Sequence, residues 1–139
     1  MKILCANELV RLLPASSQDV AEALQLLQSL IARFESVASL QYRFEEGLIQ
    51  CVNVEIAGQR IYTIFFCHDS ITKSIQFAAA RMDRGSEDFF PLLVESGEKI
   101  AREKGARWIH FSTKRAGIVE KFQRFGYEPD TINMVKEVA

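Results

Sequence analysis

SEDFFPLLVESGEKIAREKGARWIHFSTKRAGIVEKFQRFGY, residues Ser86–Tyr127, is the stretch that decides the fold. Ser86 has a side chain typical of helix N-caps, and the apolar residues after it keep helical spacing. Gly105 is expected to end this helix, because glycine adopts the left-handed C′ conformation without strain. A strand and a short second helix are then predicted over Ala106–Thr113 and Ala116–Phe125.

The chain before this stretch predicts a helix followed by three strands. Apolar residues between Val20 and Phe34 stand three and four positions apart, which is typical of an amphipathic helix. Three apolar runs separated by turn residues then predict an antiparallel meander over Leu48–Ile56, Arg60–Cys67 and Thr72–Met82.

The remaining segments give shorter predictions. Lys2–Cys5 is predicted as a first strand or as the start of a helix to Leu13, and Pro14 interrupts either one. Glu35–Gly47 is predicted as a connection with a short extended piece, and Ile132–Val138 as a last strand.

Length and composition predict one domain over residues 1–139. The net charge of −1 gives no excess of positive charge for nucleic acid, and no apolar run is long enough for a membrane span. Three cysteines without a CxxC spacing are typical of reduced thiols, so we expect a cytoplasmic protein. No His and Cys spacing fits zinc, and we expect no metal.

The order of predicted elements resembles the GCN5-related N-acetyltransferase (GNAT) family. In that family a long helix ending in ARERG leads into a strand, a short helix ending in Gly-Phe and a final strand. The counterparts here are AREKG at 101–105, ARWIHFST at 106–113, VEKFQRFGY at 119–127 and INMVKEV at 132–138. The resemblance implies an α+β or α/β class, with a mixed, mostly antiparallel sheet and helices on both faces.

The resemblance also implies acetyl-CoA as cofactor. GNAT enzymes hold its pyrophosphate on a loop of pattern Gln/Arg-x-x-Gly-x-Gly/Ala, whose glycines let backbone N–H groups approach the phosphates. The counterpart here has one glycine, and Glu87 stands at a position where the family has the next one, so the motif is degenerate. The implied cofactor-binding residues are Phe77, Ala78, Ala79 and Ala80 along the pantetheine arm, and Arg81, Arg84, Gly85 and Ser86 at the phosphates.

Two residues are candidates for acid–base catalysis. Glu55 is the one acid inside an apolar strand, in a region from which the family often takes its general base. His110 lies on the strand that borders the cofactor and acceptor cleft in the family. Structural explanations stay open for both: an outward-facing acid and a half-buried, hydrogen-bonded histidine. The family's tyrosine acid falls at Phe122, which cannot donate a proton.

Three functions therefore stay open. The first is an acetyl-CoA-dependent N-acyltransferase for a small-molecule or protein amine. The second is a non-catalytic GNAT-like interaction or accessory protein, of the kind that phages and prophages encode. The third is an unrelated α+β dimer with a ligand pocket between helix and sheet. Exposed aromatics and an open sheet edge would favour a homodimer.

Overall fold

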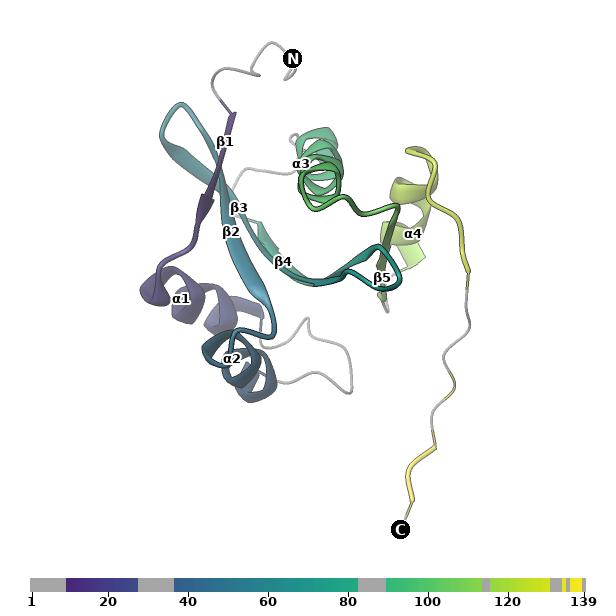
Figure 1. The fold of residues 1–139 in the computed structure, drawn as a ribbon, viewed down its shortest axis with the longest axis horizontal. Coiled ribbons are helices and arrows are strands. Elements are labelled where there is room, and N and C mark those ends of the chain that lie inside the picture. Colours follow the sequence, from purple (N-terminus) through teal and green to yellow (C-terminus); the bar gives the residue numbers. More distant parts are fainter. Residues whose placement is uncertain are drawn as a thin grey trace.

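The computed structural model describes residues 10–27, 37–82, 90–113, 116–130, 134 and 136–138. A helix, three strands, a helix, a strand and a helix follow one another as predicted, with one further helix between the first helix and the three strands (Figure 1). Their bounds are β1 Val10–Pro14, α1 Ser17–Leu27, α2 Val37–Glu45, β2 Gln50–Ile56, β3 Gln59–Asp69, β4 Ser74–Met82, α3 Phe90–Glu103, β5 Trp108–Phe111 and α4 Ala116–Gln123.

The strands form one sheet in the order β1-β2-β3-β4-β5. The first four strands pair antiparallel, and β5 pairs parallel to β4 because α3 carries the chain back across the sheet. Helices α1 and α2 lie on one side of the sheet, and α3 and α4 lie on the other (Figure 1). The predicted mixed, mostly antiparallel sheet with helices on both faces is confirmed.

An apolar core lies between the sheet and the helices on each of its two faces. On the α3 side, Ile64 and Phe66 of β3 pack with Leu92 and Ile100. On the α1 and α2 side, Phe65 of β3 packs into a second core with apolar residues of both helices. Residues 61–66 are all buried, as expected for a strand covered on both faces.

Glycines end α3 and α4 in the same way. Gly105 has a φ of 68°, and its N–H donates to the Arg102 carbonyl while the Ala106 N–H donates to the Ala101 carbonyl. These two bonds satisfy carbonyls that the last turn of a helix leaves unpaired. Gly126, with a φ of 89°, repeats the arrangement after α4. Both predicted helix ends are confirmed.

The prediction of a connection over Glu35–Gly47 is wrong, because residues 37–45 form α2. Leu40, Tyr42 and Phe44 alternate as in a strand, but the inward side chains are Val37, Leu40 and Phe44 at helical spacing. Tyr42 is 59% exposed, so the alternation did not mark a buried face.

The predictions for the two termini also need correction. Val10–Pro14 is a strand, so a helix to Leu13 is wrong; Lys2–Cys5 lies outside the described residues. Pro14 is accepted as the last residue of an edge strand, where its missing N–H costs no ladder bond. No strand is present at residues 134 and 136–138, which are the described part of the predicted last strand. Met134 is 91% exposed, so that side chain has no packed partner to hold an extended ladder.

Candidate functional site

The first feature of the candidate site is the end of pairing between β4 and β5. The two strands pair from Ser74↔Trp108 to Phe77↔Phe111. β4 then continues to Met82, whereas β5 ends at Phe111. Beyond this split, no described strand pairs with the β5-facing edge of residues 78–82. Its N–H and C=O groups can pair with an extended ligand in the way they would pair with a neighbouring strand.

A β-bulge lies at the start of this open edge. Phe65 opposes Ala79 and Phe66 opposes Phe77, so Ala78 is an additional residue in β4. Ala78 and Ala79 both contact the α1 and α2 core, while Phe77 packs on the α3 side. A bulge redirects backbone groups and bends its strand, and such bulges are common next to active sites. The residues implied for the pantetheine arm, Phe77–Ala80, therefore coincide with the bulge and the open edge.

Helix α3 lies close to β4 behind the split. The Phe77 ring is in edge contact with Phe66, with their ring centroids 6.4 Å apart. A Cβ atom built on Gly97 would lie 3.0 Å from Phe77 Cζ, closer than ordinary side-chain contacts. Glycine at position 97 thus lets α3 pack closely against the ring of Phe77, the last residue of β4 that pairs with β5.

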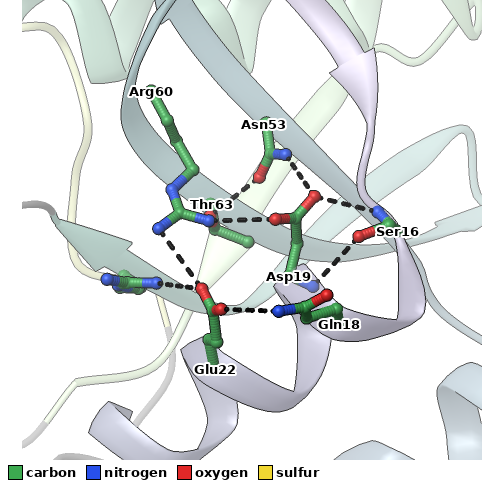
Figure 2. Close-up of polar contacts among 8 residues, drawn as sticks. Ser16, Gln18, Asp19, Glu22, Asn53, Arg60 and Thr63 are labelled. Atoms are coloured by element: carbon green, nitrogen blue, oxygen red, sulfur yellow. Dashed lines mark hydrogen bonds and ion pairs between the residues drawn. The ribbon is translucent and has the colours of Figure 1, made fainter.

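A polar cluster on the α1 side adjoins the C-terminal end of β4, at Arg81 (Figure 2). Its centre is Asp19, in the first turn of α1. Asp19 Oδ2 accepts hydrogen bonds from the Ser16 N–H at 3.1 Å and from Asn53 Nδ2 at 2.9 Å, and Oδ1 accepts one from Arg60 Nη1 at 3.1 Å. The Ser16 hydroxyl in turn accepts a bond from the Asp19 N–H, which completes a capping box. Thr63 extends the cluster by donating to Asn53 Oδ1.

The charges in this cluster are paired. The Ser16 N–H bond, the Asn53 bond and the Arg60 charge lower the pKa of Asp19, against an opposing effect of burial. Glu22 lies 3.6 Å from Arg60 Nη2 and 4.0 Å from Arg81 Nη1. Arg81, implied as a phosphate contact, therefore directs its guanidinium toward α1 in this structure.

An open hollow of about 590 Å³ lies beside the cluster. Its lining brings together two residues that the sequence singled out, Glu55 and Arg81. Glu55 is half-buried there rather than simply outward-facing. The remaining lining residues are Asp19, Asn53, Gly58, Gln59 and Arg60.

His110 occupies a different place, beside the split. It opposes Gln76 of β4, and Gln76 Oε1 accepts a hydrogen bond from Cys67 Sγ at 3.4 Å. Directly opposed residues share a face of a sheet, so His110 lies on the α1 and α2 side. Its side chain is exposed, which departs from the half-buried alternative. Three strand spacings, about 14 Å, separate its strand from that of Glu55, so the two candidates cannot act on one atom.

Phe122 lies in an aromatic cluster between α3, β5 and α4. Its ring centroid is 4.4 Å from that of Phe111, 4.9 Å from that of Tyr127 and 5.0 Å from that of Phe90. Burial, with the nearby charge of Glu98, raises the pKa of Tyr127 to about 12. Phe122, at the position of the family's acid, is therefore a packing residue. Tyr127 keeps its proton at neutral pH.

Three of the predicted cofactor-binding residues cannot be placed at the split or at the Asp19 cluster. Arg84, Gly85 and Ser86 lie outside the described residues. In the part of the chain that the structure describes, no group of three His, Cys, Asp or Glu side chains is placed to hold a metal ion. Likewise, none of its helices combines the length and apolar character needed to cross a bilayer. The bulge and the Asp19 cluster were missed from the sequence; the Ser16-x-x-Asp19 spacing was the available local signal.

Comparison with known proteins identifies the fold through structure alone. No family profile matches the sequence, and no curated protein matches it. A Trypanosoma brucei acetyltransferase superposes with a TM-score of 0.65 at 13% identity, over 93% of this chain and 99% of that chain. Ribosomal-protein-alanine N-acetyltransferase from Brucella melitensis gives 0.66 at 11% identity, over 93% and 99%.

A third solved structure contains a cofactor analogue. It is AAC(6')-Iy in complex with the bisubstrate analogue CoA-S-monomethyl-acetylneamine, and it superposes with a TM-score of 0.61 at 12% identity, over 94% of this chain and 99% of that chain. These similarities extend over most of the chain, including the N-terminal half that the sequence matched only in element order. The fold of this chain is therefore that of the GCN5-related N-acetyltransferases.

Proposed function

We propose that this protein is an acyl-CoA-dependent N-acyltransferase, and that the pantetheine arm of its bound cofactor lies along the open edge of β4. The observation that carries the proposal is the split: pairing ends at Phe77↔Phe111, and β4 continues with a bulge at Ala78. The fold supports it, because solved structures that superpose on this chain are acetyltransferases and one of them contains a CoA conjugate.

The residues beside the split fit such an arm. Ala78, Ala79 and Ala80 have small side chains, so a ligand chain can come close to the backbone. The open N–H and C=O groups suit the amides of pantetheine, which pair as a short strand would. When bound, the cofactor supplies the acyl thioester. Arg81 is directed toward Glu22, so the phosphate contacts that we propose come chiefly from Arg84 and the backbone at Gly85 and Ser86.

We assign the general base to His110 rather than to Glu55. An amine nucleophile must lose a proton, and an imidazole nitrogen within reach of the acceptor can take it. His110 is one residue pair from the split and opens to solvent on the α1 and α2 face. The acceptor in this proposal is an amine of a small molecule or a protein that approaches from that face.

Ligand-dependent stabilisation tests cofactor binding. A native-state ligand at 100 times its Kd raises the free energy of unfolding by about 2.7 kcal/mol. We expect saturable stabilisation by micromolar acetyl-CoA and by CoA. The variant Ala80→Phe places a large ring on the exposed part of the open edge and should weaken binding at least tenfold. Ala38→Phe, at an exposed position of α2, is the matched control and should bind normally.

The outcome that overturns the proposal is clear. If millimolar CoA gives no stabilisation, the open edge is not a cofactor site, and the non-catalytic accessory role takes its place. If Ala80→Phe and Ala38→Phe bind CoA equally well, the cofactor lies elsewhere on the molecule.

A further inference from the structure

Part of the sheet beside the split is not covered by α1 and α2. Trp108 of β5 opposes Ser74 of β4, and His110 opposes Gln76, so these four side chains lie on the α1 and α2 face. Ile109, between them in the strand, packs with the α3 core on the other face. The core under α1 and α2 includes no described residue of β5, and both helices lie toward the β1 side of the sheet (Figure 1). We call the four residues the shelf.

The shelf places a large apolar ring next to a group that can accept a proton. Trp108 is 62% exposed, so most of its indole is open to a ligand. His110, two positions later in the strand, is exposed as well. Residues i and i+2 of a strand lie about 7 Å apart on one face, so a single small molecule can contact both side chains.

Positive charge gathers at the Trp108 end of the shelf. The Cζ atom of Arg107 lies 5.7 Å from the centre of the Trp108 ring, within the range of a cation–π contact. The N–H groups of Arg107 and Trp108 both donate to the Lys73 carbonyl, at 2.6 and 3.1 Å, which brings a second exposed cationic residue to this end. Asp69, which opposes Ser74, uses its Oδ1 atom to accept two N–H bonds of its own turn. The two cations therefore favour an anionic group of a ligand at this end.

We propose that the shelf binds a small amino acid whose amine and carboxylate are about 7 Å apart, as in an ω-amino acid. The Arg107 guanidinium pairs with the carboxylate through charge-assisted hydrogen bonds, the aliphatic chain lies on Trp108, and the amine reaches His110. The inference rests on the proposed function in one respect, the use of the bound amine as acyl acceptor. On transfer, the amine nitrogen bonds the acyl carbon, the C–S bond of the thioester breaks with its electron pair on sulfur, and His110 accepts the amine proton.

Tryptophan fluorescence of the full-length chain tests the binding step. Trp108 is the only tryptophan in the sequence, so its emission reports on the shelf directly. The two probes are 6-aminohexanoate and hexylamine, which have the same chain length and differ in the carboxylate. Titration with 6-aminohexanoate should shift the emission to shorter wavelength and saturate, because the bound chain covers an exposed indole. Hexylamine should bind at least about tenfold more weakly, the ratio expected for the loss of one hydrogen bond between charged groups.

Two charge-removing variants locate the carboxylate contact. Arg107→Gln should raise the Kd for 6-aminohexanoate at least about tenfold and leave the Kd for hexylamine unchanged. Arg124→Gln removes the same charge at an exposed position after α4, and it is the matched control that should bind both probes normally. Equal Kd values for the two probes, equal effects of the two variants, or no emission change with either probe overturns the inference.

Acetylation assays separate this inference from the proposed function. With acetyl-CoA present, kcat/KM for 6-aminohexanoate should exceed that for hexylamine at least about tenfold, in line with the difference in binding. Equal acetylation of the two amines without selective binding overturns the amino-acid site and leaves the acyltransferase in place. Selective binding without acetylation of either amine supports the site and overturns the acyltransferase role.

Discussion

The two faces of the sheet carry different chemistry where β4 and β5 separate. On the α1 and α2 face the last opposed pair is Gln76 and His110, and on the α3 and α4 face it is Phe77 and Phe111. The contrast continues away from the split. One face has the hydrogen-bonded Asp19 cluster between helix and sheet, and the other has aromatic rings in edge-on and tilted contact around Phe122.

The difference suggests a separate role for each face: packing on one face holds the strands and helices in place, and a side chain on the other face can accept a proton. Aromatic and aliphatic packing fixes where β4, α3 and β5 lie, but those rings cannot accept a proton. His110, the proposed general base, is on the other face. Substitutions on the α3 and α4 face should therefore change the stability of the fold, and substitutions of exposed groups on the α1 and α2 face should change chemistry.

The largest expected effect is on the packed face. Phe66 is 1% exposed and contacts Phe77 at the back of the split. Phe66→Ala should lower the free energy of unfolding by about 3–5 kcal/mol, because it removes buried apolar area and leaves a cavity. Urea denaturation measures the change. Phe125→Ala, at a side chain that is 41% exposed, is the control and should cost clearly less. Equal losses in the two variants would show that burial in the core between α3 and the sheet does not set the cost of removing a ring.

The second prediction concerns the exposed face at the same split. If His110 is the general base, His110→Gln should reduce amine acetylation about 100-fold, a typical contribution of general base catalysis. Release of CoA thiol from acetyl-CoA, with a panel of primary amines as acceptors, measures this rate. CoA affinity and Tm should not change, because the side chain is exposed.

The matched variant on the opposite face is Phe111→Leu. It should lower Tm and leave the rate per folded molecule near its natural value, since Phe111 packs against Phe122 and Tyr127. Full activity of His110→Gln would remove His110 from the mechanism. A loss of activity in Glu55→Gln under the same assay would then move the base to the hollow beside Asp19.

The fold could be predicted from the sequence because most elements carry local signals. Helices α1 and α3 bury residues at helical spacing, and Gly105 and Gly126 end their helices with positive φ. Helix α2 was missed because Leu40, Tyr42 and Phe44 imitate a strand pattern, whereas its inward residues include Val37, outside that pattern. Local periodicity cannot reveal which of two faces the rest of the protein covers.

The candidate site was harder to predict because it arises from tertiary pairing. The bulge at Ala78 falls in a run of three alanines, which contains no turn residue, and it exists only in register with Phe65 and Phe66. Asp19 bonds Asn53 and Arg60, which are 34 and 41 residues away in the chain. Asn53 and Arg60 are polar residues in apolar strands, a signal for buried polar partners that does not say which partners they have.

The third prediction tests the polar core of the α1 and α2 face. Asp19→Ala removes a capping-box acceptor and leaves Asn53 and Arg60 without that carboxylate. We expect a loss of about 2 kcal/mol in the free energy of unfolding, the upper range for a cap combined with a buried polar contact. Gln18→Ala, one residue earlier and exposed, is the control and should change stability by less than about 0.5 kcal/mol. A loss for Asp19→Ala no larger than that of the control would show that the hydrogen bonds of Asp19 have no part in holding α1 against the sheet.

The smallest expected effect is a pH dependence confined to the same face. Hydrogen bonds from Ser16 and Asn53 and the Arg60 charge hold the pKa of Asp19 below its ordinary 3.8 in the folded protein. A group whose pKa is lowered by folding stabilises the native state above its unfolded pKa, and this contribution is lost as the pH falls toward the folded value. Below about pH 4, the natural protein should therefore lose stability faster than Asp19→Asn, which keeps an acceptor but does not titrate. The Thr72 and Ile71 N–H groups also lower the pKa of Asp69, but this residue lies on an exposed turn. Asp69→Asn should therefore reduce the loss of stability at acid pH less than Asp19→Asn does. If Asp69→Asn reduced the loss of stability below about pH 4 more than Asp19→Asn does, the pH dependence would arise mainly in the turn. The two faces of the sheet would then not differ in how the pH affects stability.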